Sequence, residues 1–247
     1  MSNDPGFRNK VAIVTGASRG IGRVICLGLA KRGCAVVGNA RHLDSSPGSG
    51  GTLKETIQLA ESFGVEAIAI PGEITHPDGV DALVKRTLDE LGRVDILINN
   101  AGVYPYGEIS EFEPSEWKDV MEVNLTAPFL MCRAVVPHMI QIGSGNIINV
   151  SSGAAHKMTT GRVAYAASKW ALNRFTFNLA EEVKQYGVAV NAWSPGVIRT
   201  DMNRYRDGAD EPSIVEESAV WLAAQGIDFT GHEVNRAEFG VVWGPGC

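Results

Sequence analysis

The chain has 247 residues, and its 45% hydrophobic and 20% charged residues exclude a disordered or fibrous protein. A chain of this length buries enough surface to fold without a disulfide or metal staple, so we expect a single domain over residues 1–247. The formal net charge of −6 argues against a broad basic face for nucleic acid. No uncharged apolar run approaches the ~18 residues of a membrane span, and the N-terminus lacks the basic and apolar regions of a secretory signal.

Cysteine usage favours a reducing compartment. The four cysteines are Cys26, Cys34, Cys132 and Cys247, and no two of them have the CxxC spacing of a redox or zinc motif. We therefore expect buried, reduced thiols, no metal site and a cytoplasmic location.

Short apolar runs alternate with longer amphipathic stretches along the chain, as in a βαβ series. The runs cover residues 11–15, 34–38, 65–70, 94–98, 146–150 and 188–193, and the amphipathic stretches include residues 21–31, 52–62, 79–91 and 117–142. Runs rich in Val, Ile and Ala are typical of a parallel sheet that is buried on both faces. The sequence therefore predicts an α/β fold: a doubly wound parallel sheet of Rossmann type, with about seven strands and helices on both faces. The seventh strand is expected near Val234, Ala237 and Phe239.

A glycine-rich turn joins the first predicted strand to the first helix. Gly16 permits a tight turn, Gly20 lets a diphosphate approach the backbone, and Gly22 lets the helix and strand pack closely. The helix that follows offers free N–H groups to phosphates. The turn lacks the Lys-Ser/Thr pair of a P-loop, so it favours dinucleotide binding over nucleotide hydrolysis.

The end of the second predicted strand indicates which dinucleotide is bound. An acidic residue there favours NAD, whereas a basic residue accommodates the 2′-phosphate of NADP. This chain has Ala40 followed by Arg41, and Arg19 lies on the same side in the glycine turn. The two arginines predict a preference for NADP(H). NAD(H) is the alternative, because Asp44 lies further along the same loop.

Four polar residues further along the chain point to proton transfer. Tyr165 and Lys169 are four residues apart at the start of a predicted helix and therefore share one face. A lysine ammonium beside a phenol lowers the pKa of the phenol, which suits proton transfer at neutral pH. Ser152 ends the fifth predicted strand, where its hydroxyl can bond a substrate carbonyl oxygen. Asn124 lies within a helix, where Asn has poor propensity, and this suggests a functional role.

Together these features resemble the short-chain dehydrogenase/reductase family in its single-domain branch. The matching elements are Thr15-Gly16-x-x-x-Gly20-x-Gly22, Asn99-Asn100-Ala101-Gly102, Asn124, Ser152, Tyr165-x-x-x-Lys169 and Pro195-Gly196. The resemblance implies that Tyr165 exchanges the proton on the substrate oxygen while Ser152 polarises that oxygen. It further implies that Lys169 holds the nicotinamide ribose and lowers the pKa of Tyr165. Asn124 would seat a water that links Lys169 to solvent.

The resemblance also implies a set of cofactor contacts. The contacts are Gly16, Ser18, Arg19, Gly20, Ile21, Gly22, Ala40, Arg41, Glu73, Ile74, Asn99, Asn100, Ala101, Gly102, Tyr165, Lys169, Pro195, Gly196, Ile198 and Thr200. Ile198 and Thr200 would hold the nicotinamide carboxamide. The sequence departs from the family pattern in two places. The family usually has Asp, followed by Val or Leu, where this chain has Glu73-Ile74. The usual Asp-Gly-Gly ending is replaced after Thr230-Gly231.

Three loops are predicted to line the substrate site, near residues 103–113, 153–162 and 200–211. Candidate lining residues are Tyr104, Pro105, Tyr106, Gly153, Ala154, His156, Trp193, Met202 and Tyr205, with Ser152 and Tyr165 at the reacting oxygen. Their aromatic and apolar character favours a ketone or secondary alcohol with a hydrophobic body. The sequence thus predicts an NADP(H)-dependent carbonyl reductase or alcohol dehydrogenase.

Two other functions stay open. Arg204 and Arg206 could meet the phosphate of an acyl-carrier or coenzyme A thioester, as in a 3-oxoacyl reductase, although four acidic residues interleave with them. A regulator could bind NADP without turnover, but it would have little reason to keep Ser152, Tyr165 and Lys169 together.

A homodimer or homotetramer is also expected. The helical stretches 117–142 and 163–185 have more apolar positions than one sheet face can cover. These positions include Trp117, Met121, Phe129, Phe175 and Phe177. The family resemblance implies the same kind of assembly.

Overall fold

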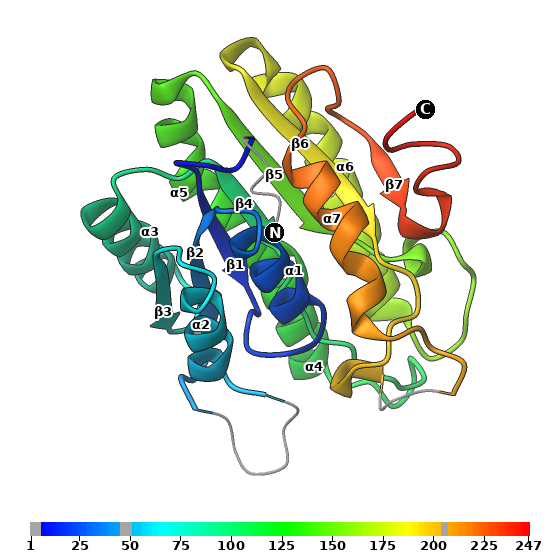
Figure 1. Ribbon diagram of the computed structural model, residues 1–247. Helices are drawn as coiled ribbons and strands as arrows, with labels where there is room; N and C mark the ends of the chain where they lie inside the picture. The colour runs from blue at the N-terminus through cyan, green and yellow to red at the C-terminus, as the bar shows by residue number, and fades with distance from the viewer. Residues whose placement is uncertain (1–5, 45–50, 204–206) are drawn as a thin grey trace.

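A computed structural model describes residues 6–44, 51–203 and 207–247 of the chain. Seven strands form one sheet in the order β3-β2-β1-β4-β5-β6-β7, and all neighbouring strands are parallel. The order reverses at β1, because the chain runs outward to β3 and then returns to place β4 on the other side of β1 (Figure 1). This confirms the predicted doubly wound sheet and puts the ligand crevice at the carboxyl ends of β1 and β4.

The strands and helices alternate along the chain as predicted. The strands are β1 (Val11–Thr15), β2 (Ala35–Ala40), β3 (Ala67–Pro71), β4 (Ile96–Asn99), β5 (Gly145–Val150), β6 (Val188–Ser194) and β7 (Glu233–Asn235). The helices are α1 (Gly20–Ala30), α2 (Leu53–Glu61), α3 (Pro77–Leu91), α4 (Pro114–Met121), α5 (Ala127–Ile142), α6 (Val163–Val183) and α7 (Glu216–Ala223).

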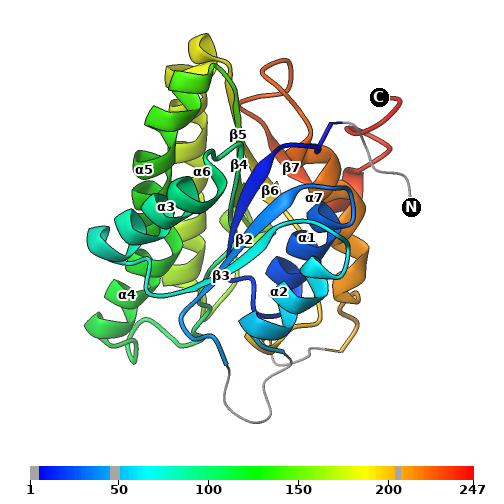
Figure 2. The same cartoon turned by 60° about the vertical axis from the view of Figure 1, so that its left-hand side comes forward.

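The helices cover both faces of the sheet. Figure 2 shows α1, α2 and α7 against one face and α3, α4, α5 and α6 against the other. Alternate residues of β1 serve the two faces: Ala12 and Val14 belong to the core beneath α1, while Val11 and Ile13 belong to the core beneath α5. Successive side chains of a strand point to opposite faces, so burial on both sides produces the continuous apolar runs in the sequence.

The single helix predicted over residues 117–142 is wrong in one respect. A π-helical segment, Glu122–Thr126, joins α4 to α5. Pro128 has no N–H, so it cannot donate to the carbonyl oxygen of Asn124 four residues earlier, as an α-helix requires. Local widening of this kind is frequent at functional sites.

Two expectations for other parts of the chain also need correction. Cys26, Cys34 and Cys132 are buried, but Cys247 is exposed, because it lies beyond β7 and outside both buried cores. The seventh strand spans only Glu233–Asn235, and a 3-10 turn over Arg236–Glu238 follows it. Ala237 and Phe239 therefore lie outside the sheet.

One helical stretch among the described residues, Pro114–Ile142, is long and apolar enough to cross a membrane by length and composition alone. Its most apolar window has a mean hydropathy of 1.3. In the structure this stretch consists of α4, the π-helical segment and α5, which pack against α3 and α6. Core helices of globular proteins meet the same criterion, so the stretch is weak evidence for a span.

Candidate active site

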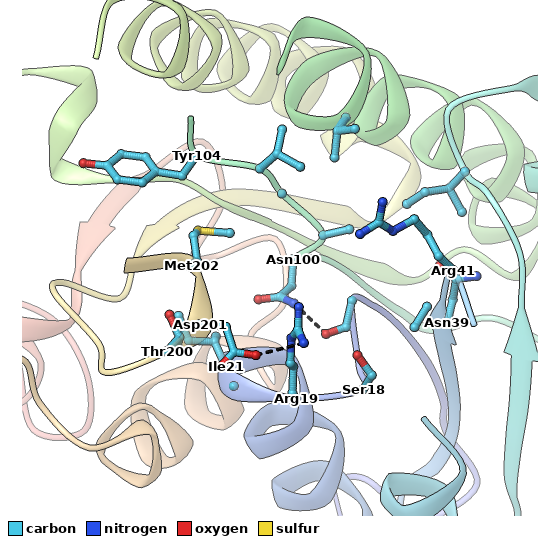
Figure 3. Close-up of a pocket in the computed structure, with 18 of the residues that line it drawn as sticks. Ser18, Arg19, Ile21, Asn39, Arg41, Asn100, Tyr104, Thr200, Asp201 and Met202 are labelled. Atoms are coloured by element: carbon cyan, nitrogen blue, oxygen red, sulfur yellow. Dashed lines mark hydrogen bonds and ion pairs between the residues drawn. The ribbon is translucent and has the colours of Figure 1, made fainter. Parts of the chain in front are cut away.

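A cavity of about 800 Å³ opens at the carboxyl ends of the central strands (Figure 3). Its walls come from the glycine turn, from the ends of β2, β3 and β4, and from the loop that follows β6. The predicted cofactor contacts that line it are Gly16, Ser18, Arg19, Gly20, Ile21, Ala40, Arg41, Glu73, Ile74, Asn100, Ala101, Gly102 and Thr200. The fold therefore brings residues from distant parts of the sequence around one ligand-sized space.

The glycine turn is built so that its backbone stays open to a ligand. Gly16 and Gly20 have φ angles of +67° and +57°, a left-handed conformation that side chains disfavour. A Cβ atom at Gly22 would lie 2.3 Å from the carbonyl oxygen of Gly16, so only glycine lets the helix approach the turn. Asn100 donates hydrogen bonds to the carbonyl oxygens of Thr15 and Gly16, at 2.9 and 3.2 Å, and fixes the turn from β4. This cradle fits the diphosphate of a dinucleotide.

Arg41 and Arg19, the two arginines predicted to bind a 2′-phosphate, have different surroundings. Arg41 follows β2 and extends its guanidinium into the cavity (Figure 3), and it forms no ion pair with any described acidic residue. Arg19 forms an ion pair of 2.8 Å with Asp201, which lies after β6 on the opposite wall. The charge of Arg19 is therefore already partly compensated, whereas that of Arg41 is available to a ligand.

Ser152, Tyr165 and Lys169 meet at the junction of β5 and α6. Ser152 follows β5 directly, and Tyr165 and Lys169 are buried one turn apart near the start of α6. Burial raises the pKa of the Tyr165 phenol above its usual value of 10.0, and a hydrogen bond with the Ser152 side chain acts in the opposite direction. The serine hydroxyl and the phenol are thus held together at the carboxyl end of a central strand.

The pKa of Tyr165 is raised overall in this structure, and the lowering influence of Lys169 stays a prediction. The Nζ atom of Lys169 donates a hydrogen bond to the carbonyl oxygen of Val150 at 2.7 Å and lies 5.8 Å from the centre of the Tyr165 ring. The desolvation of Tyr165 outweighs the influences that lower its pKa. Burial also lowers the pKa of Lys169 itself, to about 8, because the ammonium loses its hydration.

The side chain of Asn124 bonds to other parts of the protein, and the water relay that the resemblance implied stays a prediction. Its side-chain oxygen accepts the N–H of Val103 at 2.9 Å, and its amide donates to the carbonyl oxygen of Val103 at 3.0 Å. The same amide donates to the Ser168 hydroxyl at 3.1 Å. Asn124 thus ties the π-helical segment to the loop after β4 and to α6, on which Tyr165 and Lys169 lie.

The predicted substrate loops at 103–113 and 153–162 lie side by side. The N–H of Gly107 donates to the carbonyl oxygen of Gly161 at 3.1 Å. Tyr104 lines the cavity, and its ring meets the Tyr165 ring edge to face with centroids 4.5 Å apart. The His156 ring bonds Glu233 of β7 at 2.7 Å.

Of the other predicted lining residues, Pro105 and Met202 border the cavity, while Tyr205, Arg204 and Arg206 lie outside the described residues.

Trp193 was predicted to line the substrate site, and this is wrong. Its side chain is fully buried in the core between the sheet and the α1–α7 layer. The strand alternation that sends Trp193 inward cannot be read from an uninterrupted apolar run. On the nicotinamide side, Ile198 is buried in the same core, and neither it nor Pro195 or Gly196 lines the cavity.

Sequence reasoning missed the residues that hold β5 against α6. The hydroxyl of Ser151 donates to the side-chain oxygen of Asn173 at 2.5 Å, and the amide of Asn149 donates to the Thr176 hydroxyl at 2.8 Å. These buried bonds set the spacing between the strand end with Ser152 and the helix with Tyr165. The sequence offered one signal: Asn173 lies four residues after Lys169 and therefore on the same face of the helix.

The comparisons with known protein sequences agree with this geometry. A family model described as short chain dehydrogenase matches residues 10–210. The chain is 40% identical over 193 residues to a 3-oxoacyl-[acyl-carrier-protein] reductase of Synechocystis sp., an alignment that covers 78% of this chain and 76% of that protein. It is 39% identical to a 3-oxoacyl-[acyl-carrier-protein] reductase of Vibrio cholerae, with 80% and 77% covered.

Solved structures share the fold over nearly the whole chain. A metagenomic short-chain oxidoreductase in complex with NADP superposes with a TM-score of 0.81 at 35% identity, covering 93% of this chain and 97% of that one. A putative short-chain alcohol dehydrogenase from Sinorhizobium meliloti gives a TM-score of 0.84 at 29% identity, with 93% and 95% covered.

Proposed function

Because the chain belongs to the short-chain dehydrogenase family, we propose that it is an NADP(H)-dependent oxidoreductase that interconverts a ketone and a secondary alcohol. The observation that carries the proposal is the grouping of Ser152, Tyr165 and Lys169 at the end of β5. Tyr104 links this group to the large cavity, since it lines the cavity and its ring contacts Tyr165.

The preference for NADP(H) rests on Arg41 and on the shape of the glycine turn. The turn offers N–H groups and an open backbone to a diphosphate. Arg41 presents an uncompensated guanidinium where a 2′-phosphate would extend from the ribose, and a guanidinium can bond a phosphate through two N–H groups. The complex of NADP with the 35% identical metagenomic relative supports this choice.

The protein's part in the reaction is to place the carbonyl group and to move one proton. When bound, the nicotinamide cofactor supplies the hydride. The Ser152 hydroxyl donates a hydrogen bond to the substrate oxygen, and the Tyr165 hydroxyl gives that oxygen its proton during reduction or takes it during oxidation. Lys169, with a pKa of about 8, is charged at neutral pH and holds ribose hydroxyls while its own position is fixed by Val150.

The direct test is a turnover assay with a panel of ketones. The proposal expects NADPH oxidation with at least one neutral or acidic ketone, and loss of that activity in Ser152→Ala with cofactor binding retained. The variant removes only the hydroxyl that orients the substrate oxygen. Wild-type protein that binds NADPH and turns over no carbonyl compound would instead support a non-catalytic NADP-binding regulator.

A second candidate is reduction of a 3-oxoacyl thioester, and the names of two relatives at 40% and 39% identity favour it. The loop at 200–211 was the predicted contact for a thioester phosphate. Three of its described acidic residues pair with arginines outside the loop: Asp201 with Arg19, Asp210 with Arg236, and Glu211 with Arg199. A 3-oxoacyl thioester in the same assay separates the two candidates, because only the second expects it to be the best substrate.

A further inference from the structure

Arg162 is a partly buried cation with no carboxylate partner in the described part of the chain. It directly precedes α6, three residues before Tyr165. Its Nε atom is inaccessible to solvent and has no hydrogen-bond acceptor among the described residues. The other partly buried arginines of the described chain do have acids: Arg23 pairs with Glu55, Arg32 with Glu216, and Arg236 with Asp210.

A partly buried guanidinium without an acidic partner is unfavourable unless a ligand supplies the opposite charge. A guanidinium has five N–H donors and no acceptor, and burying an unpaired charge is unfavourable. The Arg162 guanidinium lies over the face of the Tyr104 ring, 5.3 Å from its centre. A cation–π contact leaves the N–H donors at the edge of the guanidinium unused.

The position of Arg162 connects this charge to the proposed chemistry. The Tyr104 ring contacts the Arg162 guanidinium and also meets the Tyr165 ring edge to face. The positive charge is near enough to the reacting phenol to favour its ionised form. Because the Arg162 guanidinium and the Tyr165 ring both contact Tyr104, a group bound by Arg162 lies close to a carbonyl held by Tyr165.

We propose that Arg162 binds a carboxylate on the substrate, so that the preferred carbonyl compounds are short-chain oxo acids. This deepens the proposed function and rests on it. A carboxylate matches the fork of N–H groups that a guanidinium presents, and it supplies the charge that the surrounding protein lacks. Neutral ketones and neutral thioesters of the same length leave Arg162 unpaired and are therefore poorer substrates.

The test compares each oxo acid with its own methyl ester. The probes are 3-oxobutanoate, 4-oxopentanoate and 5-oxohexanoate, with NADPH and wild-type protein, Arg162→Met or Arg174→Met. Arg174 is the control, because it lies on α6, is exposed and has no acidic partner among the described residues. Wild-type protein and the control are expected to favour at least one acid over its ester by about tenfold or more in kcat/KM.

Arg162→Met is expected to remove that preference by raising KM for the acid more than KM for the ester, while any change in kcat through Tyr165 is the same for both substrates. Equal losses for acid and ester in Arg162→Met would assign Arg162 a structural role and overturn the proposal. A wild-type preference for the esters would overturn it as well.

A binding measurement keeps this inference separate from the proposed function. Calorimetric titration of the same acids into protein saturated with NADP⁺ needs no turnover. Binding by wild type that Arg162→Met loses supports the carboxylate site, even if no ketone is reduced and the proposed function fails. Binding that Arg162→Met retains, or the lack of binding of any acid by wild type, contradicts the site whatever the outcome of the ketone panel.

Discussion

Lys169 donates a hydrogen bond to the backbone carbonyl oxygen of Val150, 2.7 Å away, from a position that is 5% exposed. Val150 ends β5, two residues before Ser152, so the bond holds a cation beneath the strand end that presents the serine hydroxyl. Burial lowers the pKa of this lysine from 10.5 to about 8. The proposed mechanism needs Lys169 as a charged ammonium, yet the residue lies in a buried position that disfavours charge.

The cost of burying Lys169 makes the stability of the protein depend on pH. Between about pH 8 and pH 10.5 the unfolded chain keeps a proton that the folded chain has lost, so stability rises with pH across this window. Lys169→Met removes the titration. We expect wild type to gain stability relative to this variant as the pH rises through the window, by on the order of 3 kcal/mol at most. Urea denaturation at the two ends of the window measures the difference, and an unchanged difference would contradict the pKa of Lys169.

Arg41→Ala tests whether Arg41 binds the 2′-phosphate of NADP. A charge-assisted hydrogen bond contributes roughly 1.5–3 kcal/mol, which corresponds to about a tenfold change in affinity or more. The ratio of kcat/KM for NADPH to that for NADH is therefore expected to fall by about tenfold in Arg41→Ala. Steady-state kinetics with both cofactors measure this ratio in the wild type and in the variant. A wild type that uses them equally, or an unchanged ratio in the variant, excludes Arg41 as the selective residue.

Arg19→Ala is the matched comparison for Arg41→Ala. Asp201 already pairs with Arg19 at 2.8 Å, so less of its charge is available to a phosphate. We expect a smaller fall in the NADPH to NADH ratio than Arg41→Ala causes, measured in the same assay. A larger fall would mean that Arg19 leaves Asp201 and becomes the main phosphate ligand.

Much of the fold could be predicted because its signals are local. Strands buried on both faces produce apolar runs such as β1, and the glycines of the first turn are required by backbone geometry rather than by distant partners. The interruption around Asn124 was also signalled locally by Pro128, although the sequence analysis overlooked it.

The parts that could not be predicted depend on which residues meet in space. Trp193 is the penultimate residue of a fully buried strand, and no alternation of polar and apolar residues shows which way its ring points. The pairing of Arg19 with Asp201 joins residues far apart in the chain. The high pKa of Tyr165 arises from burial, which a four-residue spacing to Lys169 does not reveal.

Exposed apolar residues on the α4–α6 layer predict self-association. Trp117, Phe129, Val163 and Trp170 are exposed, while Met121, Phe175 and Phe177 are partly buried within the chain. Contact with a second copy would remove the exposed rings from water. Sedimentation velocity at micromolar concentration is expected to show an oligomer that Phe129→Asp weakens. Val241→Asp, at an exposed position near the C-terminus, is the control and should have no effect. A wild-type monomer would refute the prediction.

The most direct test of the whole account is the rate of NADPH oxidation by Tyr165→Phe, measured with the best carbonyl substrate of the wild type. The variant keeps the aromatic ring that packs against Tyr104 and removes only the hydroxyl that exchanges the proton. General acid–base catalysis typically contributes about 10²- to 10⁴-fold, so kcat should fall by that range while the affinity for NADPH is unchanged. A variant that retains a kcat close to that of wild type would contradict the account, because another group would then supply the proton.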